Sequence, residues 1–177
     1  MIEEQLKAYI RDIPDFPQPG IVFKDITPLL QQPELVKLAV QEFAKKLEGI
    51  EIDVIAGIES RGFLFGFLLA QELNKPFVPI RKQGKLPFHT ISESYKLEYG
   101  QATIEMHEDA IQNGTKVLMH DDLLATGGTV VAASKLVEKL GGVITGYSFV
   151  ISLDFLQSAG RLTRFSDNII SLVHYED

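Results

Sequence analysis

The sequence predicts an α/β fold in which helices flank a mainly parallel sheet. The first observation behind this prediction is an alternation along the chain between apolar runs of strand length and longer stretches with helical spacing. Such an alternation favours parallel strands joined by right-handed crossovers. The second observation is that the apolar runs are nearly continuous, which is typical of strands covered on both faces. Connecting loops then gather at the carboxyl ends of the strands, where a binding site is expected.

The first part of the chain, about residues 1–32, is expected to form a short hood ahead of the sheet. Apolar residues at helical spacing predict a short helix over residues 1–12, ending where Pro14 intrudes. The following stretch, DFPQPGIVFKDI, is expected to be an ordered loop. A core-facing helix is predicted to begin at Pro33 and to stop near Gly49, because proline favours the first turn of a helix and glycine its end.

Four apolar runs are predicted to be strands, and two helical stretches lie between them. The strands are expected at residues 53–58, 76–80, 116–120 and 143–153, and the helices at residues 62–73 and 129–140.

The region between Lys82 and Asp109 is different, because it is polar and has no helical period. A mobile hairpin around Gly100 is predicted there. Residues 154–177 are expected to finish the edge of the sheet. No repeat or linker-like composition is present, so residues 1–177 are expected to form one domain.

The composition narrows the classes of function. At 177 residues with 45% hydrophobic positions, the chain is long enough for one well-buried domain. Its 17 Lys and Arg against 24 Asp and Glu give a net charge of −7, which disfavours nucleic acid as a partner. The absence of cysteine excludes disulfides, thiolate nucleophiles and cysteine-based zinc sites. Neither a secretory leader nor an apolar stretch of membrane-spanning length is present, so no membrane contact and a cytoplasmic location are expected.

The stretch VLMHDDLLATGGTVV predicts a phosphate-binding turn. It runs from a strand through two aspartates and a glycine-bearing loop into a helix, and the first N–H groups of a helix attract phosphate. Gly127 and Gly128 allow close approach of the backbone, while Thr126 and Thr129 add hydroxyl donors. The stretch matches neither the lysine-bearing P-loop nor the dinucleotide glycine pattern, so a sugar phosphate is the expected ligand.

Asp121 and Asp122 precede this turn and are interpreted as acceptors for the hydroxyls of a ribose. A carboxylate beside the sugar would also favour positive charge at the anomeric carbon, so glycosyl transfer is the leading chemistry. The alternative interpretation is a solvated loop pair next to glycines that only turn the chain. The ordered string of strand, acids, turn and helix favours the first interpretation.

The string DDLLATGGT resembles the signature of the type I phosphoribosyltransferase family, and most closely that of the members that use adenine. DFPQPGIVFKDITPLL, GIESRGFLFG, FVPIRKQGKLP and SYKLEYG are similar to the same members in the same order, so the resemblance covers essentially the whole chain. It implies transfer of the phosphoribosyl group from 5-phosphoribosyl 1-diphosphate to adenine, which yields AMP and diphosphate in purine salvage. It also implies a homodimer, and Mg²⁺ carried on the diphosphate substrate rather than by protein ligands.

The resemblance further assigns the groups that bind the phosphates. A helix start that follows a strand, with Arg61 beside it, is also physically suited to bind an anion. The alternatives are a surface ion pair for Arg61 and a solvated cluster for the basic residues after the second strand. In similar enzymes the peptide before the corresponding serine is cis, so a cis peptide is predicted between Glu59 and Ser60. The 5-phosphate turn is implied at Ala125, Thr126, Gly127, Gly128 and Thr129, and the diphosphate site at Glu59, Ser60, Arg61, Arg81, Lys82 and Lys85.

An adenine site is implied at Val22, Phe23, Lys24 and Leu153. The base would stack on Phe23, and its exocyclic amine would meet backbone groups of Val22 and Lys24. Backbone recognition of this kind can select an amino over a keto purine. Without the resemblance, Phe23 and Leu153 would both be assigned to the core.

The catalytic residues implied by the resemblance are Glu98, Arg61 and Arg81. Glu98 matches a residue near the imidazole edge of adenine, where it could handle a proton as the glycosidic bond forms. Taken alone, it would be interpreted as a solvated strand residue. The resemblance also implies a lid over about residues 83–106 that closes over the reacting centre, with Tyr99 as an aromatic that could pack over the closed site.

Three residues depart from the family pattern. His120 stands where an aliphatic residue is usual, and it is expected to be a packed or hydrogen-bonded core residue that could tune the pKa of Asp121. Phe88 and His89 lie in a variable part of the lid.

Two rival functions stay open. One is transfer of the phosphoribosyl group to guanine, hypoxanthine or xanthine, and the other is a non-catalytic regulator that senses 5-phosphoribosyl 1-diphosphate. The regulator is disfavoured, because such proteins usually carry an added DNA-binding segment and this chain is acidic.

Overall fold

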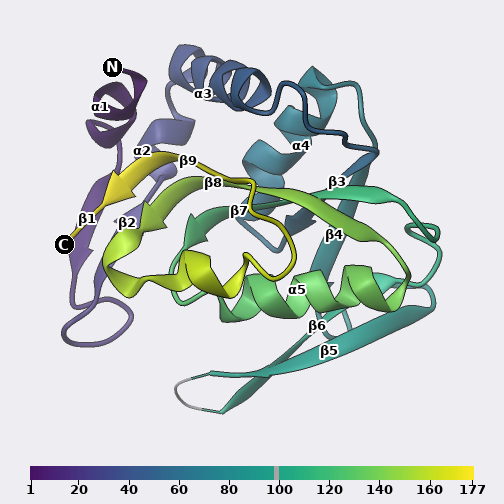
Figure 1. The fold of residues 1–177 in the computed structure, drawn as a ribbon. Helices are drawn as coiled ribbons and strands as arrows, with labels where there is room; N and C mark the ends of the chain where they lie inside the picture. The colour runs from purple at the N-terminus through teal and green to yellow at the C-terminus, as the bar shows by residue number, and fades with distance from the viewer. Residues whose placement is uncertain (98–99) are drawn as a thin grey trace.

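The computed structural model of the chain contains a seven-stranded sheet with helices on both faces (Figure 1). The structure describes residues 1–97 and 100–177. The strands of this sheet are β3 (Val54–Ile58), β4 (Phe77–Lys82), β5 (Thr90–Lys96), β6 (Gln101–His107), β7 (Lys116–Leu124), β8 (Val143–Leu153) and β9 (Ile169–Tyr175). They lie in the order β5-β6-β4-β3-β7-β8-β9. β4, β3, β7, β8 and β9 are parallel, and β6 pairs antiparallel with both β4 and β5. The predicted α/β class with a mainly parallel sheet is confirmed.

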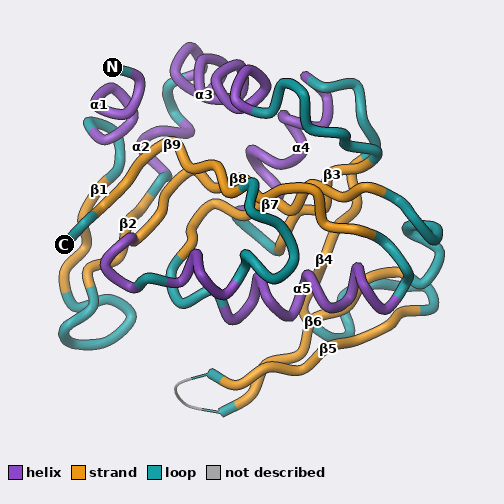
Figure 2. The backbone as a smooth tube through the Cα atoms, viewed as in Figure 1, coloured by secondary structure: helices purple, strands orange, loops and turns teal. Residues whose placement is uncertain are grey.

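The helices divide between the two faces of the sheet (Figure 2). They are α1 (Ile2–Lys7), α2 (Thr27–Leu30), α3 (Pro33–Lys46), α4 (Gly62–Glu72) and α5 (Gly128–Lys139), with short 3-10 turns η1 (Asp154–Leu156) and η2 (Ser158–Arg161). The first four cover one face and α5 covers the other, next to the β5–β6 hairpin. In β3 every residue is buried, and successive side chains enter opposite cores. The interior therefore consists of two apolar layers with the sheet between them.

The hood differs from its prediction. The first helix is α1 and ends at Lys7, and Pro14 closes a strand, β1 (Arg11–Pro14), instead of ending a helix. The expected loop contains β2 (Val22–Asp25), which pairs antiparallel with β1 in a separate two-stranded ribbon. Both strands have four residues. β1 is mostly exposed, and the buried residues of β2 are the charged Lys24 and Asp25, so neither strand carries the apolar pattern that identifies a strand.

Two further elements extend beyond their predicted ends. β7 continues past residue 120 through both aspartates to Leu124, and β4 continues to Lys82. The hairpin predicted around Gly100 is confirmed, with β5 and β6 in register from Thr90 opposite His107 to Lys96 opposite Gln101. β9 forms the sheet edge, as predicted for the last part of the chain.

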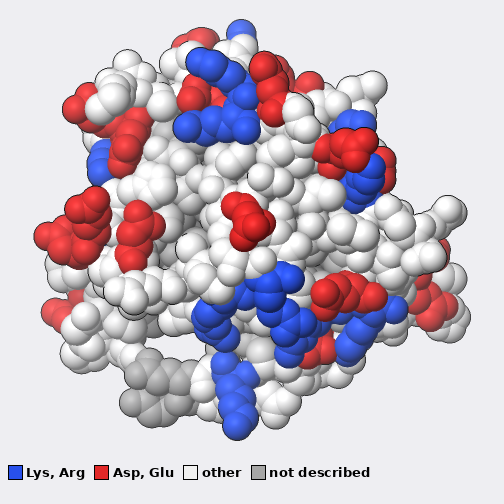
Figure 3. All heavy atoms as spheres, viewed as in Figure 1, with Lys and Arg blue, Asp and Glu red and all other residues white. Residues whose placement is uncertain are grey.

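The β5–β6 hairpin rests on α5. The carboxylate of Glu93 lies 2.6 Å from Nζ of Lys139 and 3.5 Å from Nζ of Lys135, and Lys139 also donates to the backbone oxygen of Ser92 at 2.8 Å. Figure 3 shows basic side chains gathered on this face of the molecule, over the region of α5. The base of the predicted lid is thus held on this helix, and its closure stays a prediction.

No helix within the described part of the chain combines the length and the apolar character required to cross a bilayer.

Candidate active site

The turn between β7 and α5 presents an open helix start. Gly127 precedes α5 with a φ of +78°, a left-handed conformation that residues with a Cβ rarely adopt. Val131 donates a hydrogen bond to the carbonyl of Gly127 at 2.9 Å, which closes the first turn of the helix. Within residues 1–97 and 100–177, the N–H groups of Gly127, Gly128 and Thr129 donate to no backbone oxygen. These three donors are therefore free for an anion.

Asp121 and Asp122 lie inside β7 rather than in the following loop. The carboxylate of Asp122 is buried, and its own N–H donates to Oδ1 of Asp121 at 2.8 Å. Burial raises the pKa of Asp122, against the opposing effect of the nearby Arg61 charge. Burial and the neighbouring carboxylate together raise the pKa of Asp121 well above its ordinary value. The interpretation of this pair as solvated loop residues is wrong.

A glycine lets the start of α4 approach the acid pair. A Cβ at Gly62 would lie 2.8 Å from Oδ1 of Asp121 and 3.1 Å from its Cα, which is closer than side-chain atoms normally approach. Any larger residue would push α4 away from β7. The close approach brings the loop Glu59–Arg61 beside the two aspartates.

Arg61 joins this loop to the acid pair and to the hood. Its Nε lies 3.0 Å from Oδ2 of Asp122, and its guanidinium lies over the ring of Phe23 at 4.6 Å from the centroid. Among the described residues, Nη1 of Arg61 is buried without a hydrogen-bond partner, and Oδ2 of Asp122 is buried and accepts no hydrogen bond although it is ion-paired with Arg61. A donor and an acceptor are thus both available to a ligand, so Arg61 does not form the ordinary surface ion pair considered from sequence.

These groups line a cavity of about 230 Å³ between the two loops. Its walls include residues from β3, β7, α5 and the hairpin. The sequence-predicted residues that it brings together are Glu59, Ser60, Arg61, Lys82, Asp121, Asp122 and Thr129.

Glu59 holds the basic residues of β4. Its carboxylate accepts a hydrogen bond from Nη2 of Arg81 at 3.0 Å and another from the N–H of Lys82 at 2.8 Å. The Arg81 hydrogen bond, ahead of the other contacts, lowers the pKa of Glu59. Lys85 contributes only its backbone oxygen, which accepts from Arg81 at 3.1 Å, and its side chain is exposed. The peptide between Glu59 and Ser60 is cis, as predicted.

A second cavity, of about 780 Å³, lies between the hood and the carboxyl ends of β7 and β8. Leu123 lines this cavity and the smaller one, so the two adjoin at this side chain. All four residues predicted for the adenine site line it, together with Ala125 and Thr126 of the phosphate turn. The predicted members are Val22, Phe23, Lys24 and Leu153.

Several lining residues were not assigned from the sequence. Tyr175 lies under the ammonium of Lys24, 3.8 Å from Nζ to the ring centroid, and Asp12 pairs with the same ammonium at 2.8 Å. Tyr95 lines the smaller cavity, and its hydroxyl accepts a hydrogen bond from Thr129 at 3.0 Å. The only sequence signal for Tyr95 is an aromatic residue in the predicted lid. Glu98 and Tyr99, the two lid residues predicted from the family resemblance, lie outside the described residues.

His120 is fully buried behind the site, as predicted. Its Nδ1 is 2.7 Å from Oγ of Ser148, and its ring meets Phe43 edge-on at 5.6 Å between centroids. Burial lowers the pKa of His120 to about 3, so the ring is neutral.

Comparisons with known proteins agree with this geometry. Residues 26–153 match the family model described as the phosphoribosyl transferase domain. The adenine phosphoribosyltransferase of Cytophaga hutchinsonii is 53% identical over 175 residues, which cover 99% of this chain and 97% of that protein.

Solved structures lead to the same family. The adenine phosphoribosyltransferase of Thermoanaerobacter pseudethanolicus superposes with a TM-score of 0.94 at 48% identity, covering 99% of this chain and all of the other. The Saccharomyces cerevisiae enzyme, solved with adenine and D-2,5-dideoxy-2,5-imino-altritol 1,6-bisphosphate, has a TM-score of 0.90 at 39% identity. The match covers 97% of this chain and 98% of the yeast chain. This chain therefore belongs to the phosphoribosyltransferase family, and the relatives that it matches from end to end are adenine phosphoribosyltransferases.

Proposed function

We propose that this chain transfers the phosphoribosyl group of 5-phosphoribosyl 1-diphosphate to adenine, forming AMP and diphosphate in purine salvage. The observation that carries the proposal is that two cavities with different linings adjoin at Leu123. One is lined by carboxylates, an arginine and a helix start, and the other by apolar and aromatic side chains. A sugar phosphate and a purine placed in them would meet where the cavities adjoin.

The 5-phosphate is assigned to the turn from Ala125 to Thr129. Free N–H groups at the start of α5 favour a phosphate dianion through their hydrogen bonds and through the positive end of the helix dipole. The hydroxyl of Thr129 now donates to Tyr95, and it is placed to donate to the phosphate instead.

The ribose and the diphosphate are assigned to the smaller cavity. Asp121 and Asp122 would accept hydrogen bonds from the sugar hydroxyls, since Oδ2 of Asp122 has no hydrogen-bond partner among the described residues. The free Nη1 of Arg61 would donate to the diphosphate, and Glu59 would act through Arg81 by holding its guanidinium. Ser60 and Lys82 line the same cavity, and Lys85 would contribute only through its exposed charge.

The reaction breaks the bond between C1 of the ribose and the diphosphate oxygen, and the electron pair leaves with the diphosphate. A ring nitrogen of adenine supplies the pair for the new bond to C1, and the proton of the imidazole edge passes to a base. Positive charge develops at the anomeric carbon, and the carboxylates of Asp121 and Asp122 would stabilise it. Arg61 and Arg81 would stabilise the negative charge on the departing diphosphate. Glu98 is proposed as the base.

Mg²⁺ is proposed to enter with the diphosphate substrate. Within the described residues, no three His, Asp or Glu side chains are grouped so that they could hold a metal ion. Oδ2 of Asp122, which is ion-paired with Arg61 but accepts no hydrogen bond from the described residues, fits a metal-bound water or a sugar hydroxyl at the same place. When bound, the ion would neutralise charge on the diphosphate.

Adenine is assigned to the larger cavity, stacked on Phe23. Val22 and Lys24 are the β2 residues on either side of Phe23, and their backbone groups can read the exocyclic amine. A buried site built for an amine rejects a keto purine, because an acceptor would then face the carbonyl oxygen. Leu153 would form the apolar wall on the β8 side.

A homodimer is proposed from an apolar face on α4. Leu64, Phe67 and Leu68 are 42%, 50% and 41% exposed, directly after the diphosphate loop. Such a face is typical of a subunit contact. Sedimentation at twice the mass of the chain would support this assembly, and a monomer at assay concentration would contradict it. The cytoplasmic location, the single domain over residues 1–177 and the lid, including Tyr99, stay predictions from the sequence.

The test of the function is an assay with each purine base separately. The protein is incubated with Mg²⁺, 5-phosphoribosyl 1-diphosphate and adenine, guanine, hypoxanthine or xanthine, and nucleotide and diphosphate are measured. We expect AMP from adenine and little product from the keto purines. Folded protein that forms no AMP would refute the proposal. Preferential use of a keto purine would show that this base, and not adenine, is the acceptor.

A further inference from the structure

We propose that Arg161 is a positioning residue for the 5-phosphate, and that it acts by fixing the peptide between Thr126 and Gly127. The inference rests on the proposed function, because it concerns the turn assigned to the phosphate of the ribose. Its starting point is one contact. Nη1 of Arg161 donates a hydrogen bond to the carbonyl oxygen of Thr126 at 2.6 Å, across 35 positions of the sequence.

Arg161 reaches the turn from an anchored segment. It is the last residue of η2, and the following Leu162 is fully buried in the apolar layer that includes α5. Ser158, the first residue of η2, is also buried, and its Cβ lies 3.4 Å from where a Cβ on Gly127 would stand. The η2 turn therefore packs against the phosphate turn and carries the guanidinium to it.

Because a peptide is planar, the contact between Arg161 and the carbonyl of Thr126 also fixes the direction of the N–H of Gly127. The carbonyl oxygen and the amide hydrogen of a trans peptide lie in one plane and point in opposite directions. A guanidinium that holds the carbonyl of Thr126 on the η2 side therefore aims the N–H of Gly127 away from η2. Within the residues described, that N–H donates to no backbone oxygen. It is one of the donors that a phosphate at this helix start would use.

The hydrogen bond from Arg161 is useful here because the residue after Thr126 is a glycine. Gly127 has a φ of +78°, yet glycine adopts positive and negative φ with similar ease, so the residue alone does not fix the peptide. If the peptide between Thr126 and Gly127 rotated by a half-turn, the carbonyl oxygen of Thr126 would lie where the N–H of Gly127 now lies. The negative end of the peptide dipole would then face the phosphate dianion. The hydrogen bond from a charged guanidinium is stronger than a neutral one and disfavours the rotated peptide.

Arg161 is suited to a direct test, because its side chain is exposed and does not fill the core. Ribose 5-phosphate is the probe, since it carries the 5-phosphate but neither the diphosphate nor the base. Arg161→Met is expected to weaken binding of ribose 5-phosphate about tenfold, equivalent to about 1.4 kcal/mol. The affinity for adenine and the Tm should not change. In the assay, KM for 5-phosphoribosyl 1-diphosphate should rise by a similar factor, with a smaller change in kcat.

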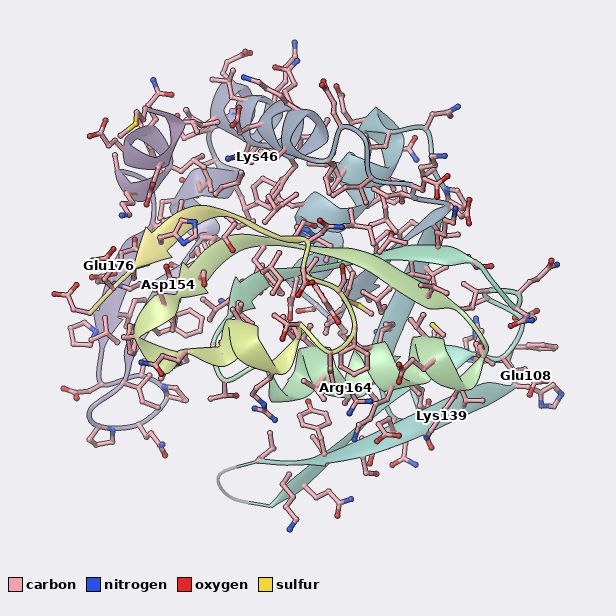
Figure 4. All side chains as sticks on the ribbon, viewed as in Figure 1. Lys46, Glu108, Lys139, Asp154, Arg164 and Glu176 are labelled. Carbon is pink, nitrogen blue, oxygen red and sulfur yellow. The ribbon has the colours of Figure 1, made fainter. Side chains whose placement is uncertain are left out.

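Two further variants sharpen the test. Arg161→Lys retains a charged donor and is expected to recover part of the lost affinity. Arg164→Met is the matched control, because Arg164 lies beside α5 (Figure 4) and pairs with Glu138 at 3.6 Å instead of the turn. It should bind ribose 5-phosphate like the unmodified protein.

Unchanged binding of ribose 5-phosphate by Arg161→Met would overturn the proposal. An equal loss of affinity for adenine together with a lower Tm would also overturn it, because the arginine would then have only a general structural role. Failure of the proposed function is a separate result, seen as the absence of AMP formation by the unmodified protein.

Discussion

The Nε atom of Arg61 lies 3.0 Å from Oδ2 of Asp122, so the loop that follows β3 and the carboxyl end of β7 are joined by an ion pair inside the smaller cavity. The partner carboxylate is buried, and the arginine also lies over one face of Phe23. Arg61, itself proposed for the diphosphate, therefore contacts one residue proposed for the ribose and one proposed for the base. This arrangement explains why burial of Asp122 is tolerated, because an unpaired buried carboxylate would be costly.

The first prediction concerns the effect of Asp121 on the free energy of unfolding. Asp121→Asn is expected to raise the free energy of unfolding at neutral pH and to reduce turnover about a hundredfold. A carboxyl whose pKa is higher when folded binds protons more tightly in the folded state. Its contribution to folding is therefore present at low pH and is lost as the pH rises from the unfolded pKa of about 3.9 towards the folded pKa.

Urea titrations of both proteins at about pH 5 and about pH 7.5 measure this effect. The advantage of Asp121→Asn should grow at the higher pH. Asp53→Asn is a matched control, because the carboxylate of Asp53 is exposed on another edge and accepts only from the N–H of Lys116. A less stable Asp121→Asn protein at the higher pH would contradict the account.

The second prediction concerns His120. A histidine whose pKa is lowered by folding, here to about 3, binds protons more weakly in the folded state. Stability is therefore lost as the pH falls below the unfolded pKa of about 6.5, by about 2 kcal/mol at pH 5. His120→Leu should lose less stability than the unmodified protein over this range.

Unfolding free energies at about pH 7.5 and about pH 5 measure the difference between the two proteins. His89→Leu serves as the control, since His89 is exposed on the hairpin side and should leave the pH dependence unchanged. Equal acid sensitivity of the His120→Leu and unmodified proteins would show that the buried ring does not control it.

The third prediction concerns the base site. Phe23→Ala should raise KM for adenine about 10- to 100-fold, since stacking on an aromatic ring is worth about 1–3 kcal/mol per base. KM for 5-phosphoribosyl 1-diphosphate should change much less. Phe88→Ala is the control, because Phe88 is exposed and contacts the rings of His89 and His107 instead of the cavity. If adenine kinetics were the same in Phe23→Ala and the unmodified protein, the base would have to bind elsewhere.

The fourth prediction concerns Glu98. Glu98→Gln keeps the size of the side chain and removes its basicity, so kcat should fall about a hundredfold or more. Binding of AMP should change only slightly, because the substitution affects proton transfer rather than the fit of the nucleotide. Single-turnover kinetics and a nucleotide titration separate the two effects. A variant that turns over at the normal rate would remove this residue from the mechanism.

The main elements of the fold were predictable because their signals are local. β8 begins and ends at the predicted residues 143 and 153, and α3 begins at Pro33, since continuous apolar runs and proline at a helix start need no tertiary context. β1 and β2 were missed because two strands of four residues without an apolar alternation are stable only against each other. The acid pair was placed beyond the end of a strand predicted to stop at residue 120, since adjacent carboxylates are rarely buried in a strand without a partner such as Arg61.

In the candidate site, too, the parts with local sequence signals were predictable and the parts that depend on distant contacts were not. The segments proposed for the 5-phosphate and the diphosphate are continuous in the sequence, so the string around Gly127 and the GIESRG loop were sufficient to predict them. Arg161 and Tyr175 gave no signal, because their contacts with Thr126 and Lys24 span long separations in the sequence. Such contacts are set by the packing of η2 and the hood, which no local pattern encodes.

The most direct measurement of the central claim is a crystal structure of the protein with bound AMP. The account predicts that the phosphate lies on the N–H groups of Gly127, Gly128 and Thr129, that the ribose hydroxyls reach Asp121 and Asp122, and that the base stacks on Phe23. A nucleotide bound elsewhere, with an empty turn and both carboxylates facing solvent, would contradict it.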